Sequence, residues 1–271
     1  MPELPEVETT CRGIAPHVEG KRLERWTVRE PRLRWPIDPA WPEQVAGQRV
    51  EALTRRSKYM ILHLEQGQII AHLGMSGQFR VLPDLQARPE KHDHSDWLFE
   101  GGTLIRYRDP RRFGAMLYVP DWTTHPLITV LGPEPLSESF NGDYLHQALQ
   151  SRRGPIKSAL MDASLVVGVG NIYANEALFE TGIHPRRAAN RISRVRCERL
   201  VTHIKDVLTR AIAQGGTTLR DYVSATGESG YFSIDLKVYG RRGQPCLSCG
   251  RPLKEIRLSG RSTVYCAHCQ R

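Results

Sequence analysis

The first half of the chain changes from a helical to a strand-like pattern of hydrophobic residues. Between Pro5 and Val18, apolar side chains recur at positions 7, 11, 14, 15 and 18. This spacing predicts an amphipathic helix with a proline in its first turn. From about residue 50 to 119, short hydrophobic runs alternate with Gly, Pro and Asp turns, which predicts an antiparallel sandwich or barrel. The strands expected there are Tyr59–Leu64, Gln68–Leu73, Gln78–Leu82, Asp96–Phe99, Thr103–Arg108 and Phe113–Val119.

The second half of the chain has helical periodicity. The helices expected there are Tyr144–Ser151, Pro155–Met161, Ile172–Glu180 and Ser193–Gln214. The segment Leu131–Phe140 is rich in turn formers and separates the two halves, so it is interpreted as an interdomain linker. We therefore predict a first domain over 1–131, a linker over 132–140, a helical domain over 141–235 and a cysteine module over 236–271.

The charge of the chain indicates a polyanionic partner. Its 38 Lys and Arg residues exceed its 29 Asp and Glu residues, which gives a formal charge of +9. Such an excess is typical of nucleic-acid-binding proteins, although it also occurs in proteins that are merely basic. No apolar run approaches the length of a membrane span, and no secretion signal is evident, so we expect a cytoplasmic or nucleoid protein without a membrane partner.

Four of the six cysteines form a strong local motif, Cys246-x2-Cys249-x16-Cys266-x2-Cys269. This number and spacing of thiolates predicts one structural Zn²⁺ with no coordination position left for a catalytic water. Between the two pairs, Glu255–Leu258 and Ser262–Tyr265 are expected to form a hairpin with Arg261 at its tip. Such a basic hairpin suits DNA phosphates, although the hairpin alone favours a solvated turn residue as the role of this arginine. The other cysteines, Cys11 and Cys197, are expected in the core.

The N-terminus offers a second candidate for chemistry. Once Met1 is removed, Pro2 carries a secondary amine next to the carboxyl group of Glu3. Such an amine attacks a sugar C1′ and gives an iminium ion, which withdraws electrons without needing a proton. Taken alone, Pro-Glu after Met is more often an inert start to a helix.

Five motifs in a fixed order make the interpretation more specific. They are Met1-Pro2-Glu3-Leu4-Pro5-Glu6-Val7-Glu8, His72-Leu73-Gly74-Met75-Ser76-Gly77, Asp109-Pro110-Arg111-Arg112-Phe113-Gly114, Val169-Gly170-Asn171-Ile172-Tyr173 and the four-cysteine module. Together they resemble the bacterial formamidopyrimidine-DNA glycosylases, and the resemblance spans the whole chain. It implies an α+β fold: an N-terminal antiparallel β-sandwich flanked by helices, then a helix–two-turn–helix domain with a zinc-finger hairpin.

The resemblance also implies a reaction, namely excision of oxidised purines such as 8-oxoguanine opposite C, followed by abasic-site lyase activity. Pro2 would attack C1′ and expel the base, and Glu3 would protonate the leaving group or the opened sugar. Lys58 matches the lysine of base release and β-elimination. Arg261 matches the arginine of the δ step, where we expect it to stabilise a phosphate, since a guanidinium gives up a proton poorly. The product would be a one-nucleotide gap with a phosphate at each end.

Further residues are implied to bind damaged double-stranded DNA. Reaching C1′ requires a nucleotide flipped out of the stack. Met75, Arg111 and Phe113, together called the wedge below, would fill the void, face the orphaned cytosine and intercalate beside it. For Met75 and Phe113 the ordinary alternative is packing in the core. Phosphate contacts are implied for His92, Arg153, Lys157 and Asn171, and Asn171 is further expected to cap the helix that begins at Ile172. Residues 214–230 resemble a lid over the everted base, or equally a passive linker.

Two alternatives explain part of the sequence. An endonuclease VIII-type glycosylase shares the Pro-Glu chemistry and the zinc hairpin but prefers oxidised pyrimidines, and the wedge residues favour the purine branch. A non-catalytic zinc-ribbon protein that binds nucleic acid would explain the charge and the cysteines. It would not explain Pro2, Glu3 and Lys58 beside the wedge residues. We therefore predict a monomeric glycosylase and lyase acting on damaged DNA.

Overall fold

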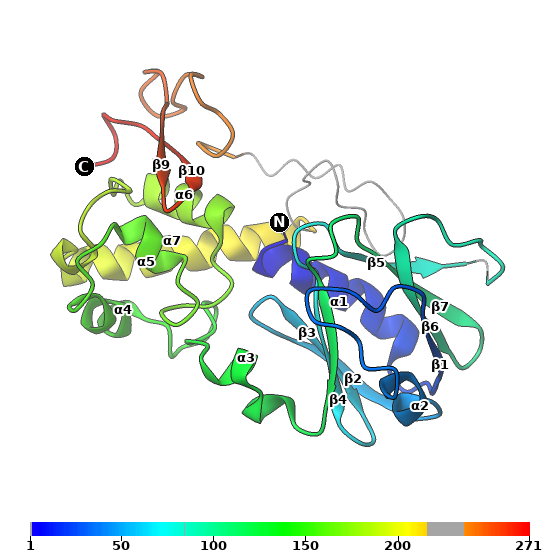
Figure 1. The fold of residues 1–271 in the computed structure, drawn as a ribbon. Helices are drawn as coiled ribbons and strands as arrows, with labels where there is room; N and C mark the ends of the chain where they lie inside the picture. Colours follow the sequence, from blue (N-terminus) through cyan, green and yellow to red (C-terminus); the bar gives the residue numbers. More distant parts are fainter. Residues whose placement is uncertain (1, 84, 216–235) are drawn as a thin grey trace. The chain divides into compact units, whose positions relative to one another are not determined.

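The computed structural model describes residues 2–83, 85–215 and 236–271 (Figure 1). These residues form two compact units. Unit 1 contains residues 2–83, 85–129 and 215, and unit 2 contains residues 130–214 and 236–271. The segment predicted to be a lid lies almost entirely outside the described residues.

Unit 1 is a sandwich of two antiparallel sheets, as predicted (Figure 1). One sheet has the strand order β1-β6-β7-β5 and the other has β2-β3-β4-β8. The strands are β1 Leu23–Val28, β2 Val50–Arg56, β3 Tyr59–Leu64, β4 Gln68–His72, β5 Gln78–Leu82, β6 Asp93–Phe99, β7 Thr103–Arg108 and β8 Ala115–Val119. The helices are α1 Leu4–Val18, α2 Trp41–Val45 and α3 Pro126–Thr129, with a 3-10 turn at Trp122–Thr124.

The predicted periodicities are confirmed because each element buries its apolar face in one common core. Helix α1 buries Val7, Cys11, Ile14 and Val18 against residues of both sheets. Three of the predicted strands match the observed bounds, and the others differ at their ends by one to three residues. Strand β1 was not predicted, since a bulge after Leu23 breaks the alternation of buried and exposed positions.

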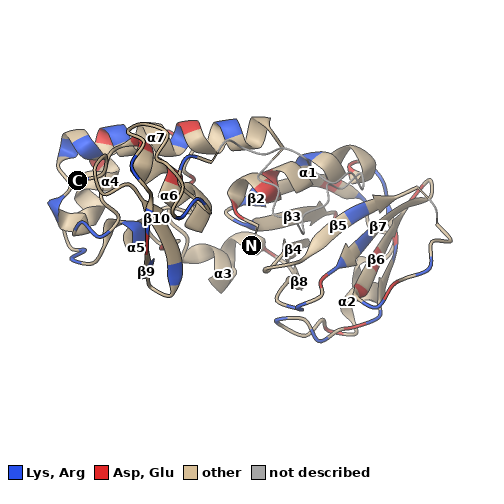
Figure 2. Ribbon diagram, turned by 90° about the horizontal axis from the view of Figure 1, so that it is seen from above, with Lys and Arg blue, Asp and Glu red and all other residues tan. Residues whose placement is uncertain are grey.

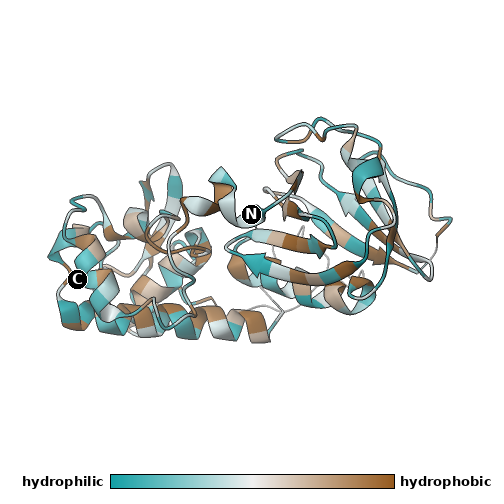
Figure 3. Cartoon of the chain, turned by 90° about the horizontal axis from the view of Figure 1, so that it is seen from below, coloured by the Kyte–Doolittle hydropathy of each residue, from teal (hydrophilic) through white to brown (hydrophobic). Residues whose placement is uncertain are grey.

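Unit 2 consists of helices with one hairpin. The helices are α4 Gly142–Leu149, α5 Ile156–Leu160, α6 Asn171–Glu180 and α7 Arg194–Ala213, and the hairpin is β9 Lys254–Leu258 with β10 Arg261–Tyr265. Lys and Arg residues recur along α7 (Figure 2), and hydrophobic and hydrophilic residues alternate around this helix (Figure 3). Cys197 is buried on α7, as expected, and burial raises the pKa of its thiol to about 11.

The cysteine hairpin packs into the core of unit 2. Phe179 of α6 lies in one cluster with Val264 of β10 and with Cys246 and Cys266. The amide nitrogen of Val264 also donates to the side-chain oxygen of Asn175 on α6, at 3.1 Å. These contacts give the hairpin a fixed base on α6. Among the described helices, none combines the length and the apolar character that a membrane span requires.

Candidate functional site

The first residues of unit 1 are held by a reciprocal cap at the start of α1. Glu3 is the N-cap: its side chain accepts from the backbone N–H of Glu6, and its own backbone N–H donates to the Glu6 carboxylate at 2.8 Å. Both side chains are almost fully buried, at 2% and 1% exposure. A capping box fixes the direction in which the chain enters the helix, and carboxylates are favoured at a helix N-terminus. Pro2, also buried, directly precedes this cap.

Lys58 lies at the tip of the β2–β3 hairpin. Arg56 pairs with Tyr59, so Ser57 and Lys58 form a two-residue turn, and Ser57 has the left-handed φ of 57° that such turns need. The end of β2 is attached to α1, because Arg55 forms a 2.8 Å ion pair with Glu8 on the second turn of that helix. The lysine and the N-terminal proline therefore lie at the same end of unit 1.

His72 lies close to Lys58, and sequence reasoning gave it no role. It ends β4 opposite Tyr59, and the two rings are 5.0 Å apart between centroids. Its Nδ1 accepts from the backbone N–H of Gly74 at 3.0 Å. Burial, with the positive charges of Lys58 and Arg34, lowers the pKa of His72 to about 4 against an opposing effect of Asp109. The imidazole is therefore neutral at pH 7 and adds no positive charge beside the lysine.

The three wedge residues lie on two adjacent loops and are all exposed. Met75 is 37% exposed and Phe113 is 44% exposed, so neither side chain is part of the core. Arg111 is exposed between them in sequence, and its guanidinium lies over the Phe113 ring, 4.8 Å from the centroid. The ordinary alternative for Met75 and Phe113, packing in the core, is wrong. His92 lies at the same end of unit 1, where its carbonyl oxygen accepts from the Asp109 N–H at 3.0 Å.

Lys157 of unit 2 is buried, with 1% exposure. Its ammonium group donates to the Asn171 side-chain oxygen at 2.6 Å, to the Ser262 carbonyl at 3.0 Å and to the Thr263 hydroxyl at 2.7 Å. It thus joins α5, the start of α6 and β10. The contact of Lys157 with a phosphate stays a prediction. In this structure the N–H groups of its ammonium are directed to these three acceptors of the protein.

The expectation that Asn171 caps α6 is wrong. Gly170 is the N-cap, with extended backbone angles, and Asn171 is the first helical residue. Its side-chain oxygen accepts from the Lys157 ammonium group. Asn171 is half-buried, so it still lies at the protein surface at the helix N-terminus.

Arg261 and Arg153 are exposed basic residues of unit 2. Arg261 is the first residue of β10 and pairs with Leu258, so the hairpin tip itself is Ser259-Gly260, with φ angles of 48° and 73°. Two successive left-handed residues make a tight turn that projects the following side chain from a rigid base. Arg153 lies in the connection between α4 and α5.

The four cysteines of the module fit one zinc ion. Their Sγ atoms all lie within 4.8 Å of one another, with 3.9 Å between Cys246 and Cys269 and 3.5 Å between Cys249 and Cys266. Four thiolates around a tetrahedral Zn²⁺ at about 2.3 Å have sulfur atoms about 3.8 Å apart. The module therefore binds one structural Zn²⁺, as predicted.

Comparisons with known proteins agree along the whole chain. Residues 1–116 match the formamidopyrimidine-DNA glycosylase N-terminal domain, residues 131–223 match the H2TH domain of the same proteins, and residues 243–271 match the zinc finger found in FPG and IleRS. The chain is 54% identical to the formamidopyrimidine-DNA glycosylase of Marinobacter nauticus and 55% identical to that of Acidithiobacillus ferrooxidans, over 100% of each chain.

Solved structures give the same result. The structure of MutM (FPG) from Thermus thermophilus is similar with a TM-score of 0.88 and 39% identity, covering 99% of this chain and 98% of that one. The Lactococcus lactis Fpg in complex with abasic-site DNA has a TM-score of 0.91 and 31% identity, covering 99% of each chain.

Proposed function

The chain belongs to the formamidopyrimidine-DNA glycosylase family, and from that premise we propose that it excises oxidised purines from duplex DNA and then cleaves the strand. The observation that carries this proposal is the grouping in unit 1. Pro2 and the buried Glu3, the hairpin tip with Lys58, and the exposed wedge all lie at one end of the sandwich. The enzyme is a bifunctional glycosylase and lyase that acts as a monomer in the cytoplasm, and we place it on the DNA of the nucleoid.

The reaction begins at the N-terminal amine. The Pro2 nitrogen forms a bond to C1′ while the bond from C1′ to the damaged base breaks, and Glu3 supplies a proton to the leaving group or to the opened sugar. The Pro2 nitrogen loses its proton and the bond from C1′ to the ring oxygen O4′ breaks as the sugar opens, which gives an iminium ion. This iminium ion acidifies the C2′ proton. Its removal breaks the bond to the 3′ phosphate in β-elimination, and a δ-elimination then releases the 5′ phosphate.

The remaining residues have supporting roles. Lys58 assists base release and β-elimination, and the neutral His72 adds no second positive charge beside it. Arg261 stabilises a phosphate during the δ step. Asn171, His92 and Arg153 bind phosphates. We propose that Lys157 serves the phosphates through Asn171, because its ammonium group holds the Asn171 side chain.

The wedge accounts for selectivity. When the damaged nucleotide leaves the stack, Met75 fills the void and Phe113 intercalates beside the orphaned base. Arg111 donates hydrogen bonds to the acceptors of cytosine, which guanine engaged before. Lesions opposite C are therefore processed in preference to lesions opposite A.

Borohydride trapping tests the proposal. A duplex carrying 8-oxoguanine opposite C is compared with a duplex carrying dihydrothymine, using the native protein and a Pro2→Gly variant. We expect a covalent adduct on the first duplex, mapped by mass spectrometry to Pro2, and a much weaker one on the second. A stronger adduct on dihydrothymine would favour the endonuclease VIII-type specificity. No adduct, with intact strands and equal binding by both proteins, would leave only a zinc-stabilised DNA-binding protein.

A further inference from the structure

Asp109 is fully buried between the two loops that carry the wedge, with 0% exposure. Its Oδ1 accepts from the Ser76 hydroxyl at 2.6 Å and from the Arg111 N–H at 3.2 Å. Its Oδ2 accepts from the Gly114 N–H at 2.8 Å and from the Tyr107 hydroxyl at 3.1 Å. One carboxylate thus binds the residue that follows Met75 and, through Arg111 and Gly114, the backbone before and after Arg112-Phe113.

The strand order forces these two loops together. Loop 73–77 leads from β4 in one sheet to β5 in the other, and loop 109–114 leads back from β7 to β8. Strand β4 pairs with β8, and β5 pairs with β7, so the two crossings run side by side at one edge of the sandwich.

The contact between the loops leaves no space for an added methyl group. A Cβ on Gly74 would lie 2.5 Å from the Phe113 carbonyl oxygen, and one on Gly77 would lie 2.6 Å from the Tyr107 hydroxyl. A Cβ on Gly114 would overlap that hydroxyl. Close-packed backbone cannot adjust one loop without moving the other.

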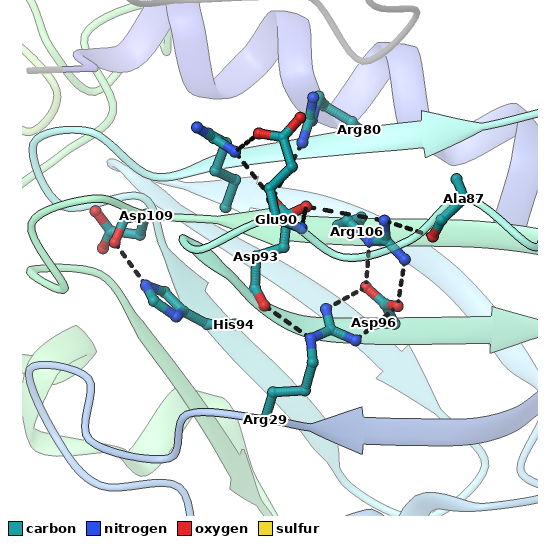
Figure 4. A network of polar contacts seen from close by, with 10 residues as sticks. Arg29, Arg80, Ala87, Glu90, Asp93, His94, Asp96, Arg106 and Asp109 are labelled. Carbon is teal, nitrogen blue, oxygen red and sulfur yellow. Dashed lines mark hydrogen bonds and ion pairs between the residues drawn. The ribbon is translucent and has the colours of Figure 1, made fainter.

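The backbone of Asp109 is held as well. Its carbonyl oxygen accepts from the His94 ring nitrogen Nε2 at 2.8 Å (Figure 4) and from the Arg112 N–H at 3.2 Å. Arg112 has a left-handed φ of 54°, which is costly for a residue with a side chain and requires surrounding contacts to persist. The Asp109 hydrogen bonds supply such contacts at the turn between Arg111 and Phe113.

We propose that Asp109, assisted by Tyr107, is a positioning residue that holds Met75, Arg111 and Phe113 as one rigid wedge and thereby sets the discrimination of the base opposite the lesion. This inference rests on the wedge role proposed above. The wedge side chains are exposed, so their geometry depends on the backbone beneath them. A backbone fixed before DNA binds presents Arg111 in one place, where it distinguishes cytosine from adenine.

An asparagine cannot replace this aspartate. Each carboxylate oxygen accepts from one backbone N–H group, of Arg111 on one side and of Gly114 on the other. The asparagine side chain offers one acceptor oxygen and one NH₂ group, so in either orientation a backbone N–H faces another donor. Asp109→Asn therefore keeps the size of the side chain and breaks the link on one side.

Asp96 provides a matched control in the same sandwich. It is also buried, and it accepts bidentate hydrogen bonds from Arg29 at 2.8 and 2.7 Å and from Arg106 at 2.9 and 2.9 Å (Figure 4). These partners lie on strands and at a strand end, not on the wedge loops. Asp96→Asn weakens a buried polar network without touching the wedge.

The experiment measures the ratio of excision rates for 8-oxoguanine opposite C and opposite A. This ratio is independent of the fraction of folded enzyme, so it separates positioning from stability. For Asp109→Asn we expect the ratio to fall roughly 10-fold, since small displacements of positioning groups cost up to about 100-fold in rate.

The controls distinguish the two levels of the proposal. Asp96→Asn should leave the ratio unchanged, and Arg111→Ala should reduce it. If Arg111→Ala leaves the ratio unchanged, the wedge role itself fails. If Arg111→Ala reduces the ratio and Asp109→Asn does not, the positioning role of Asp109 is overturned. The same holds if Asp96→Asn reduces the ratio as much as Asp109→Asn does. Tyr107→Phe removes only a hydroxyl donor and should also lower the ratio. If Asp109→Asn does not fold, the ratio measured for Tyr107→Phe tests the positioning role in its place, and an unchanged ratio would overturn that role.

Discussion

Lys157→Met tests whether the buried ammonium group acts on DNA directly or through its neighbours. Methionine keeps an unbranched apolar stem of similar length and removes the charge. Three acceptors then lose their donor: the Asn171 side chain, the Ser262 carbonyl and the Thr263 hydroxyl. A buried acceptor left without a hydrogen bond costs about 1–3 kcal/mol. The variant no longer has to bury a charged group, and this gain offsets part of the cost of the three unsatisfied acceptors. We therefore expect the free energy of unfolding to fall by roughly 2–4 kcal/mol.

The assay is the salt dependence of binding to a duplex with a reduced abasic site, followed by fluorescence anisotropy. Each phosphate neutralised by a protein cation contributes about 0.9 to the slope of log K against log salt concentration. Since the Lys157 donors are directed to protein acceptors, Lys157→Met should weaken binding and leave the slope unchanged. Arg261→Ala, which removes an exposed guanidinium, should lower the slope by about 0.9 and serves as the comparison.

One result would refute this reasoning. If Lys157→Met lowers the slope by about 0.9 and leaves the unfolding free energy at the native value, Lys157 pairs with a phosphate and its buried position does not describe the bound protein.

Three further outcomes are expected. Chelation of zinc, or the substitution Cys249→Ser, should release the hairpin and abolish most DNA affinity, because structural zinc contributes folding energy. Metal analysis combined with a DNA-binding titration measures this effect. Unchanged DNA binding by the zinc-free protein would contradict it. The pKa of His72 is about 4 when folded and 6.5 in its ordinary state. The unfolded chain therefore binds the extra proton between these values, and the unfolding free energy should fall by up to about 3 kcal/mol as the pH drops from 6.5 to 4. Denaturant titrations of native protein and His72→Gln measure this slope, and equal slopes would show that another group is responsible. Gly114→Ala should destabilise unit 1 by more than about 3 kcal/mol, since the alanine Cβ would overlap the Tyr107 hydroxyl. Thermal unfolding tests this prediction. A melting temperature equal to that of the native protein would disprove the close packing of the wedge loops.

The sequence alone determined the features that depend on neighbours along the chain. The strand Tyr59–Leu64 was predicted with its observed bounds, because a short hydrophobic run between turn residues is a local feature of the sequence. The zinc ligands could equally be predicted from the sequence, because each Cys-x-x-Cys pair is a local unit and one metal ion brings the four sulfur atoms together. The catalytic and wedge residues came from the resemblance of whole motifs, and periodicity would not have found them.

Tertiary structure alone decided which polar groups are buried and what holds them. Lys157 and Thr263 are 106 positions apart in sequence, and no local pattern indicates that one donates to the other. Asn171 was expected to cap a helix, but Gly170 is the N-cap and the Asn171 side chain accepts from the buried ammonium of Lys157. Asp109 lay within a motif that was noted only for its neighbours. Its four donors come from strand β7 and from two loops that the strand order places side by side. Periodicity reflects the environment averaged over one face of an element, whereas a buried charge depends on particular atoms that chain topology brings within hydrogen-bonding distance.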